Sequence, residues 1–219
     1  MLTHNDKTVK DALALFHECK DLPVQYWGFK NVGLSDEEMK ELVKAFRDAG
    51  KSTVLEVVAH EEKECLQAAQ FGIECGFDYL TGTVYHPSVL RLVRESPLKY
   101  MPFIGKRPYI PSVMVGSLTE IVAEARELEG HGVDGITLIS FRHKQEEPVN
   151  LTREVMRSID IPIIMAGSIN SYSRLDLMKE LNPWGFTIGG AFFDKKFVPG
   201  GSFREQIEDV LAYMLKPVQ

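Results

Sequence analysis

A carboxylate inside an apolar run is the first candidate for chemistry in this sequence. Glu56 lies in the middle of the run Val-Leu-Glu-Val-Val at 54–58. An isolated acid in an apolar strand costs free energy unless it has a partner, and burial makes a carboxylate a stronger base. We therefore expect Glu56 to act as a general base that removes a proton from carbon. The alternative is a structural ion pair with a Lys or Arg of a neighbouring strand.

A lysine ends the preceding apolar run, 24–30. Lys30 shares one face of that expected strand with Tyr26 and Gly28, because side chains alternate along a strand. An amine at the end of a strand can pair with a carboxylate or phosphate, polarise a carbonyl, or form a Schiff base. We expect one of these roles for Lys30, and the alternative is a solvated lysine without a function.

Two histidines follow neighbouring strands. His60 lies four residues after Glu56 and on the same strand face, and His86 directly precedes Pro87. Either imidazole can stabilise an enolate, so we expect one of them to assist catalysis. His86 also occupies a typical helix-capping position, which is its alternative interpretation.

Metal binding has less support in the sequence. Glu56, His60, His86 and His143 are the residue types that bind zinc or iron, but no HxH or HxxE spacing connects them. We therefore expect no metal and no cofactor. Two other polar residues at strand ends, Thr83 and Arg142, are candidates for contacts with a substrate.

Two short apolar runs that end in glycine lie close together in the sequence. The run 161–166 is followed by Gly167 and Ser168, and the run 185–188 is followed by Gly189 and Gly190. Glycine lets the backbone approach a ligand closely, and free N–H groups at a turn that opens into a helix favour an anion. Two such turns at adjacent parallel strands predict a phosphate-binding site; the alternative is two ordinary turns.

Two segments resemble the last two βα units of the ribulose-phosphate-binding barrels. They are Ile-Met-Ala-Gly-Ser-Ile-Asn at 164–170 and Gly-Phe-Thr-Ile-Gly-Gly-Ala-Phe-Phe at 185–193. That group includes the histidine-biosynthesis isomerase, ribulose-phosphate epimerase and N-acetylmannosamine-6-phosphate epimerase, and no single member is matched. The resemblance implies that backbone at Gly167, Ser168, Gly189 and Gly190 holds a phosphate. It carries over no catalytic residue.

Strand and helix patterns alternate along the whole chain, which is typical of a parallel sheet built from βα units. We expect one domain over 1–219, a (β/α)8 TIM barrel with an extra N-terminal helix near 9–16 that can plug the barrel. One crossover helix is missing between the fourth and fifth strands. The expected strands are 24–30, 53–59, 77–83, 99–104, 110–115, 133–139, 161–166 and 185–188.

Composition excludes several classes of protein. The net charge of −6 argues against general nucleic-acid binding, which needs clustered Lys and Arg. The chain has neither a signal-peptide pattern nor an apolar run of membrane-spanning length, so we expect a cytoplasmic protein without a membrane partner. Its three cysteines lack metal-binding spacing and are expected to be reduced. GxSxG, GxxxxGK[ST] and strand-opening GxGxxG motifs are absent.

These observations favour an isomerase or epimerase that moves a proton next to the carbonyl of a sugar phosphate. In this interpretation Glu56 is the base, Lys30, His60 or His86 stabilises the enolate, and a small phosphorylated metabolite is the partner. A homodimer is compatible with the sequence. Two alternatives stay open: a lyase or aldolase in which Lys30 forms an imine, and a barrel that binds a phosphorylated metabolite without catalysis.

Overall fold

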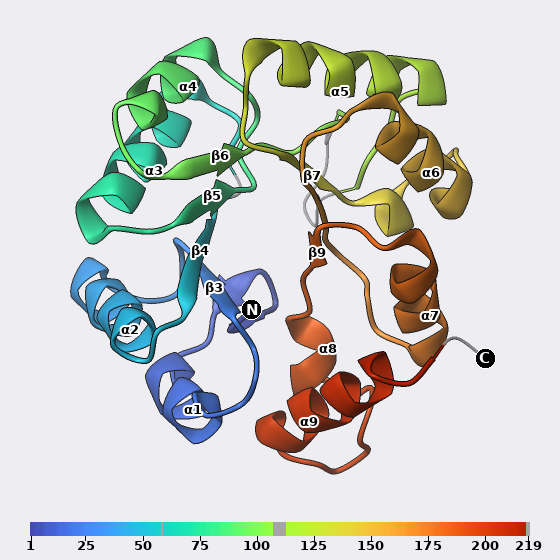
Figure 1. Ribbon diagram of the computed structural model, residues 1–219. Helices are drawn as coiled ribbons and strands as arrows, with labels where there is room; N and C mark the ends of the chain where they lie inside the picture. Colours follow the sequence, from blue (N-terminus) through green and yellow to red (C-terminus); the bar gives the residue numbers. More distant parts are fainter. Residues whose placement is uncertain (58, 107–112, 218–219) are drawn as a thin grey trace.

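The computed structural model describes residues 1–57, 59–106 and 113–217, and it forms a barrel of parallel strands surrounded by helices (Figure 1). One sheet has the order β3-β4-β5-β6 and the other β7-β8-β9. A parallel bridge between Phe103 and Thr137 joins the two sheets. This arrangement confirms the predicted (β/α)8-like TIM-barrel fold. The strands are β3 Tyr26–Lys30, β4 Ser52–Glu56, β5 Tyr79–Thr81, β6 Lys99–Met101, β7 Ile136–Leu138, β8 Ile163–Met165 and β9 Gly185–Phe186.

The helices pack their apolar faces on the outside of the barrel. Ser35, Ser117 and Ser202 begin three of them with capping boxes, in which serine accepts from the third helical N–H and a glutamate there accepts from the serine N–H. The serine and the glutamate three residues after it therefore set where each of these helices begins. The helices are α1 Ala12–Cys19, α2 Asp36–Asp48, α3 Glu62–Cys75, α4 Pro87–Arg94, α5 Leu118–His131, α6 Pro148–Ser158, α7 Tyr172–Leu181, α8 Gly190–Phe193 and α9 Phe203–Met214. None of these described helices is long and apolar enough to cross a membrane.

The predicted strand 110–115 differs from the expectation. Its residues 110–112 lie outside the described part of the chain. Of the rest, Val115 bridges Lys106 in antiparallel fashion and Met114 bridges His143. Because Phe103 pairs directly with Thr137, the described part of this segment does not stand between β6 and β7. Between β6 and Met114 the described residues, 102–106 and 113, contain no helix. The expected absence of a crossover helix concerns a segment that lies mostly outside the described part of the chain.

The N-terminal helix α1 exists, but it does not plug the barrel. It packs against α2 and α9 in the outer ring (Figure 1). Its Phe16 ring lies 4.5 Å from Phe46 and 5.1 Å from Trp27, measured between ring centroids. The candidate role as a plug is therefore excluded, and the helix serves packing, because the apolar face of α1 packs on these aromatic side chains beside the barrel wall.

Residues 3–8 form a hairpin that was not predicted from the sequence. Strands β1 (Thr3–His4) and β2 (Lys7–Thr8) pair antiparallel around Asn5 and Asp6, whose φ angles are 49° and 60°. Asn and Asp tolerate this left-handed conformation, which two-residue hairpin loops require. The Asn-Asp pair was therefore the available sequence signal.

This hairpin and the residues before it lie along the seam between the first and last strands of the barrel. Leu2 N donates to Gly28 O at 2.8 Å, and Met1 N donates to Ile188 O at 3.0 Å. Thr8 Oγ1 donates to Lys30 O at 2.6 Å. The N-terminal segment thus supplies backbone partners where β3 and β9 would otherwise have to pair with each other.

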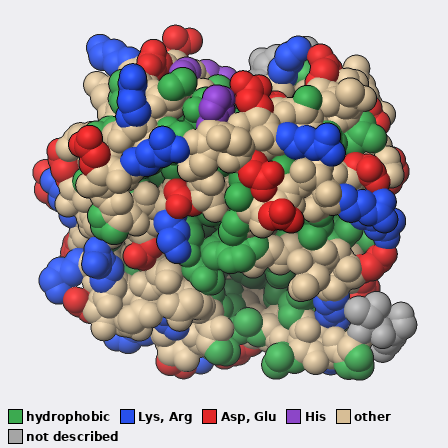
Figure 2. Space-filling view, turned by 45° about the horizontal axis from the view of Figure 1, so that its top comes forward, with side chains coloured by type: hydrophobic (Ala, Val, Ile, Leu, Met, Phe, Trp, Pro, Cys, Tyr) green, Lys and Arg blue, Asp and Glu red, His purple; other side chains and the backbone are tan. Residues whose placement is uncertain are grey.

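Apolar side chains fill the interior of the barrel and one of its ends. Val54, Tyr79, Met101 and Ile164 form a buried cluster with one residue from each of β4, β5, β6 and β8. At the amino-terminal ends of the strands, the rings of Tyr26 and Trp184 pack around Tyr79, with centroids 5.8 and 5.5 Å away. Figure 2 shows hydrophobic side chains gathered around a hollow in the lower half of its view. Polar chemistry is therefore left to the carboxyl ends of the strands.

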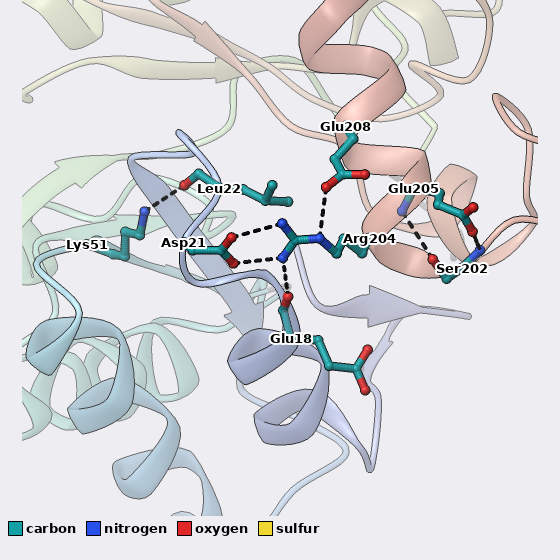
Figure 3. A network of polar contacts seen from close by, with 8 residues as sticks. All are labelled: Glu18, Asp21, Leu22, Lys51, Ser202, Arg204, Glu205 and Glu208. Atoms are coloured by element: carbon teal, nitrogen blue, oxygen red, sulfur yellow. Dashed lines mark hydrogen bonds and ion pairs between the residues drawn. The ribbon is translucent and has the colours of Figure 1, made fainter.

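An arginine joins the two ends of the chain on the outside of the barrel (Figure 3). The guanidinium of Arg204 in α9 donates twice to Asp21, at 2.7 and 2.9 Å, and once to the carbonyl of Glu18 at 2.5 Å. Its Nε also donates to Glu208 at 2.8 Å. This network ties α9 to the end of α1, which lie side by side although they are far apart in the sequence.

Arg204→Met is expected to lower Tm by on the order of 2 °C near neutral pH, because the pair is exposed and solvent screens it. The hydrogen bonds from Arg204 lower the pKa of Asp21 to about 2. A depressed pKa contributes stability above the ordinary pKa of aspartate, and the contribution is lost as pH falls toward 2. The difference in Tm between native protein and variant should therefore be constant from pH 5 to 8 and shrink below pH 4. Arg157→Met, which removes a local pair within α6, is the control; a difference that persists at pH 2 would contradict the assignment.

Candidate functional site

A cavity of about 270 Å³ opens at the carboxyl ends of β3, β4, β8 and β9. The N-terminal hairpin and the segment after β7 complete its wall. Most of the residues predicted from the sequence line this one cavity: Lys30, Glu56, Arg142, Gly167, Ser168, Gly189 and Gly190. The structure therefore brings together the expected acid, the expected amine and both glycine turns.

Lys30 and Glu56 are opposite each other in the parallel register of β3 and β4. The Lys30 Nζ atom lies 3.6 Å from Glu56 Oε1 and 2.8 Å from Asp6 Oδ1. The Lys30 side chain is only 9% exposed and that of Glu56 18%. The geometry is that of a nearly buried ammonium held by two carboxylates, so the ion pair considered as the alternative for Glu56 is present. The pair faces the cavity, where both groups remain available to a ligand.

Asp6 is a site residue that the sequence analysis did not single out. It stands in the hairpin turn, lines the cavity and accepts a hydrogen bond from Lys30. This hydrogen bond, with the charges of Lys30 and Arg142, lowers the pKa of Asp6 against the opposing effect of its partial burial. Asp6 therefore stays ionised and holds the ammonium of Lys30 in place.

The first glycine turn follows β8 and is held by two arginines. Gly167 and Ser168 have φ angles of 75° and 59°. Arg142 Nε donates to Ser168 Oγ at 3.1 Å, and the guanidinium of Arg174 donates to Ser168 O. A Cβ atom at position 167 would lie 2.8 Å from Arg142 Nε, so glycine is needed for Arg142 to lie against the turn. The turn thus combines a left-handed backbone with a fixed cation.

The second glycine turn follows β9 and leads into α8. Gly189 fits against the hairpin, since a Cβ atom there would come within 2.6 Å of Thr3 Oγ1. Gly190, the first residue of α8, has more room, with His4 Cδ2 at 3.9 Å from the position of an added Cβ. Within the described part of the chain, the N–H groups of Gly167, Ser168, Gly189 and Gly190 donate to no protein acceptor. Free donors from both turns therefore border one cavity.

Three predicted site residues do not line this cavity. His60 is exposed, and its carbonyl oxygen lies 3.0 Å from Nε2 of His86, which is at the N-terminus of α4. Thr83 is fully buried, and its hydroxyl lies 2.9 Å from the Tyr100 hydroxyl. The sequence predicted these three side chains at one site with Glu56, and the structure places them elsewhere. The loops after β4 and β5 join the two histidines to each other, and Tyr100 holds the hydroxyl of Thr83.

A further polar pair lies at the rim beside the second glycine turn. His4 Nε2 is 3.0 Å from Asp194 Oδ1, and the His4 ring stacks on Phe193 with 5.4 Å between centroids. Asp194 lines the cavity. Sequence reasoning missed both residues, because only the hairpin brings His4 to the end of α8. In the part of the chain that the structure describes, no group of three or more His, Cys, Asp or Glu side chains is arranged to hold a metal ion.

Solved structures share this fold across nearly the whole chain. A 3-hexulose-6-phosphate synthase from Salmonella typhimurium matches with a TM-score of 0.71 at 14% identity, over 96% of this chain and 95% of that one. An N-(5'-phosphoribosyl)anthranilate isomerase from Pyrococcus furiosus matches with a TM-score of 0.64 at 14% identity, over 95% of each chain. A 4-hydroxy-2-oxoglutarate aldolase matches with a TM-score of 0.62 at 18% identity, over 94% of this chain and 88% of that one.

A match to FabK from Thermotoga maritima, with a TM-score of 0.52 at 16% identity, covers 73% of this chain and 48% of that one, so the chain spans about half of that relative. No protein-family model matches the sequence. No curated protein matches it either.

The fold is therefore that of the TIM barrels. Among solved barrels of this shape are enzymes named for phosphorylated substrates, namely the synthase and the isomerase. At these identities the similarity defines the fold, and the particular reaction has to be argued from the cavity itself.

Proposed function

We propose that the protein binds a small phosphate ester, with the phosphate at the two glycine turns and the rest of the molecule toward Lys30 and Glu56. One observation carries this proposal: the turns at Gly167–Ser168 and Gly189–Gly190 border the same cavity as the partly buried Glu56 and the buried Lys30. Free backbone N–H groups suit phosphate oxygens, and Arg142 adds a positive charge at the first turn. Anchoring a remote phosphate positions a small substrate for reaction at its other end.

The reaction that suits these groups is isomerisation or epimerisation of a sugar phosphate by proton transfer next to a carbonyl. The carboxylate of Glu56 takes a proton from carbon, and the electron pair of that C–H bond moves to the carbonyl oxygen. The ammonium of Lys30, 3.6 Å from Glu56, stabilises the negative charge on that oxygen. For isomerisation, Glu56 then returns the proton to the former carbonyl carbon on the same face, while the hydroxyl proton of the first carbon moves to the former carbonyl oxygen, so no cofactor is consumed. For epimerisation, water delivers a proton to the opposite face and Glu56 gives its proton to solvent.

A thermal-shift screen tests binding. Phosphosugars at millimolar concentration are expected to raise Tm by several degrees, because a ligand that binds only the folded state stabilises it by mass action. Each is compared with its unphosphorylated parent sugar and with inorganic phosphate. A rise in Tm with the esters alone supports the proposal. Equal rises in Tm with the esters and with their parent sugars would show that the glycine turns do not bind the phosphate.

A second candidate is an aldolase-type reaction in which Lys30 forms an imine with a carbonyl substrate. It is favoured by the position of Lys30 in the cavity, yet Lys30 donates to Asp6 and lies close to Glu56, and an ammonium so paired must lose a proton before it can attack carbon. Treatment with borohydride and an aldehyde or ketone phosphate, followed by mass spectrometry, separates the two reactions. We expect Lys30 to stay unmodified; a stable adduct on Lys30 that is absent from Lys30→Met would favour the aldolase.

A further inference from the structure

A second, apolar cavity lies at the seam of the barrel. It has a volume of about 220 Å³ and lies between β3, β9 and α9. Figure 1 shows this seam, with β3 and the N-terminus on one side and α8 and α9 on the other. No charged side chain is among the described residues that line it. Its wall is formed chiefly by Trp27, Phe186, Phe203, Ile207, Leu211 and Met214.

The seam is open for a topological reason. In the described part of the chain β3 and β9 belong to different sheets, so neither strand pairs with the other. Met1 and Leu2 supply backbone partners at Ile188 and Gly28. Toward the amino-terminal ends of the strands the space is bordered by side chains such as Val24 and Phe186, which are only partly buried. A solvent-accessible apolar groove is the result.

The groove shares a wall with the polar cavity. Met1, Thr187 and Ile188 line both spaces. The side chain of Met1 fits between two glycines: a Cβ atom at Gly28 would lie 2.7 Å from its Sδ atom, and one at Gly189 would lie 3.4 Å from its Cβ atom. Methionine is unbranched and flexible, so it adapts its shape to a neighbouring ligand. The partition between groove and phosphate turns is thus narrow and deformable.

We infer that the phosphate ester carries, besides the part that reaches Lys30 and Glu56, an apolar substituent that occupies the groove beside α9. The inference rests on the proposed function, since the phosphate must lie at the glycine turns for its substituent to pass Met1. An apolar space of this size does not bind water well and favours an apolar ligand, whereas a simple sugar phosphate would leave it empty. The groove thus selects esters whose organic part is partly apolar.

The experiment is a calorimetric titration of the whole protein with inorganic phosphate, methyl phosphate, butyl phosphate and octyl phosphate below micellar concentrations, and with octanol. Affinity is expected to rise about fourfold for each added methylene until the groove is filled. The heat-capacity change on binding should become more negative with chain length, as burial of apolar surface requires.

Substitutions in α9 test whether the dependence of affinity on chain length arises in the groove. Leu211→Trp fills the groove and should abolish the dependence on chain length while methyl phosphate binds as to the native protein. Leu211→Ala enlarges the groove and should retain the dependence. Leu215→Trp is the matched control, because Leu215 ends the same helix but is 88% exposed and does not line the groove.

The outcomes separate this inference from the proposed function. If octyl phosphate binds no more tightly than methyl phosphate, or if Leu211→Trp leaves the chain-length dependence unchanged, the apolar substituent is refuted and the phosphate site stands. If neither inorganic phosphate nor any of the esters binds, the proposed function fails. If octanol binds as tightly as octyl phosphate, the groove is a separate apolar site. That result would overturn the inference that one ligand occupies both the groove and the phosphate turns.

Discussion

Glu56→Gln is expected to reduce turnover of a phosphosugar that raises Tm in the thermal-shift screen by about 10²- to 10⁴-fold, the usual contribution of a general base. Its affinity for the same ester should change by less than about threefold, because in the proposed site the glycine turns and not Glu56 bind the phosphate. Glutamine keeps the shape of glutamate and an oxygen near Lys30 but cannot accept a proton from carbon. Lys30 keeps its hydrogen bond to Asp6 at 2.8 Å, so the variant does not leave a buried cation unpaired and should remain folded.

The measurement for Glu56→Gln is exchange of the substrate C–H proton with deuterated solvent, followed by NMR together with product formation. Glu61→Gln is the control, since Glu61 is exposed, precedes α3 and does not line the cavity. Loss of exchange in Glu56→Gln with binding preserved supports a catalytic base. Unchanged exchange would eliminate that role, and an absence of exchange in the native protein with tight binding would favour a barrel that binds its metabolite without catalysis.

Gly190→Asp is expected to weaken binding of a phosphate ester on the order of 100-fold, because it places a carboxylate beside the phosphate. The substitution should not disturb the fold. The nearest atom that an added Cβ at position 190 meets is 3.9 Å away, and an acid at the first position of a helix is electrostatically favourable. Gly189 is a poorer choice, since a Cβ atom there would come within 2.6 Å of Thr3 Oγ1.

The control at the same position is Gly190→Asn, which adds a side chain of equal size without its charge. Calorimetry with the ester found in the thermal-shift screen should show a much smaller loss for asparagine than for aspartate, and the difference should shrink at high salt. Equal losses for both variants would indicate a steric effect alone. Native affinity in Gly190→Asp would place the phosphate elsewhere.

Local patterns were sufficient for the barrel and for part of its site. Alternating strand and helix periodicity predicted the fold, and serine caps fixed the starts of α2, α5 and α9. Parallel strands end at one rim, so residues that follow different strands meet there. This rule correctly placed Lys30, Glu56 and the two glycine turns around one cavity.

The same rule did not apply to residues a few positions beyond their strands. His60 and His86 lie on loops whose paths depend on contacts with each other, and Thr83 is held by Tyr100. Sequence periodicity does not describe such contacts. Nor did it indicate that Phe103, just beyond β6, pairs directly with Thr137 of β7.

The sequence by itself determined that this chain forms a βα barrel with two glycine turns and an acid and an amine at strand ends, because those features follow from residue periodicity and strand direction. Tertiary structure alone decided that Lys30 and Glu56 are adjacent, that Asp6 holds Lys30, and that the N-terminal hairpin occupies the seam. These features depend on strand register and on hydrogen bonds between segments that are far apart in the chain, such as Met1 and Ile188, and the pattern of residues near any one position does not fix them.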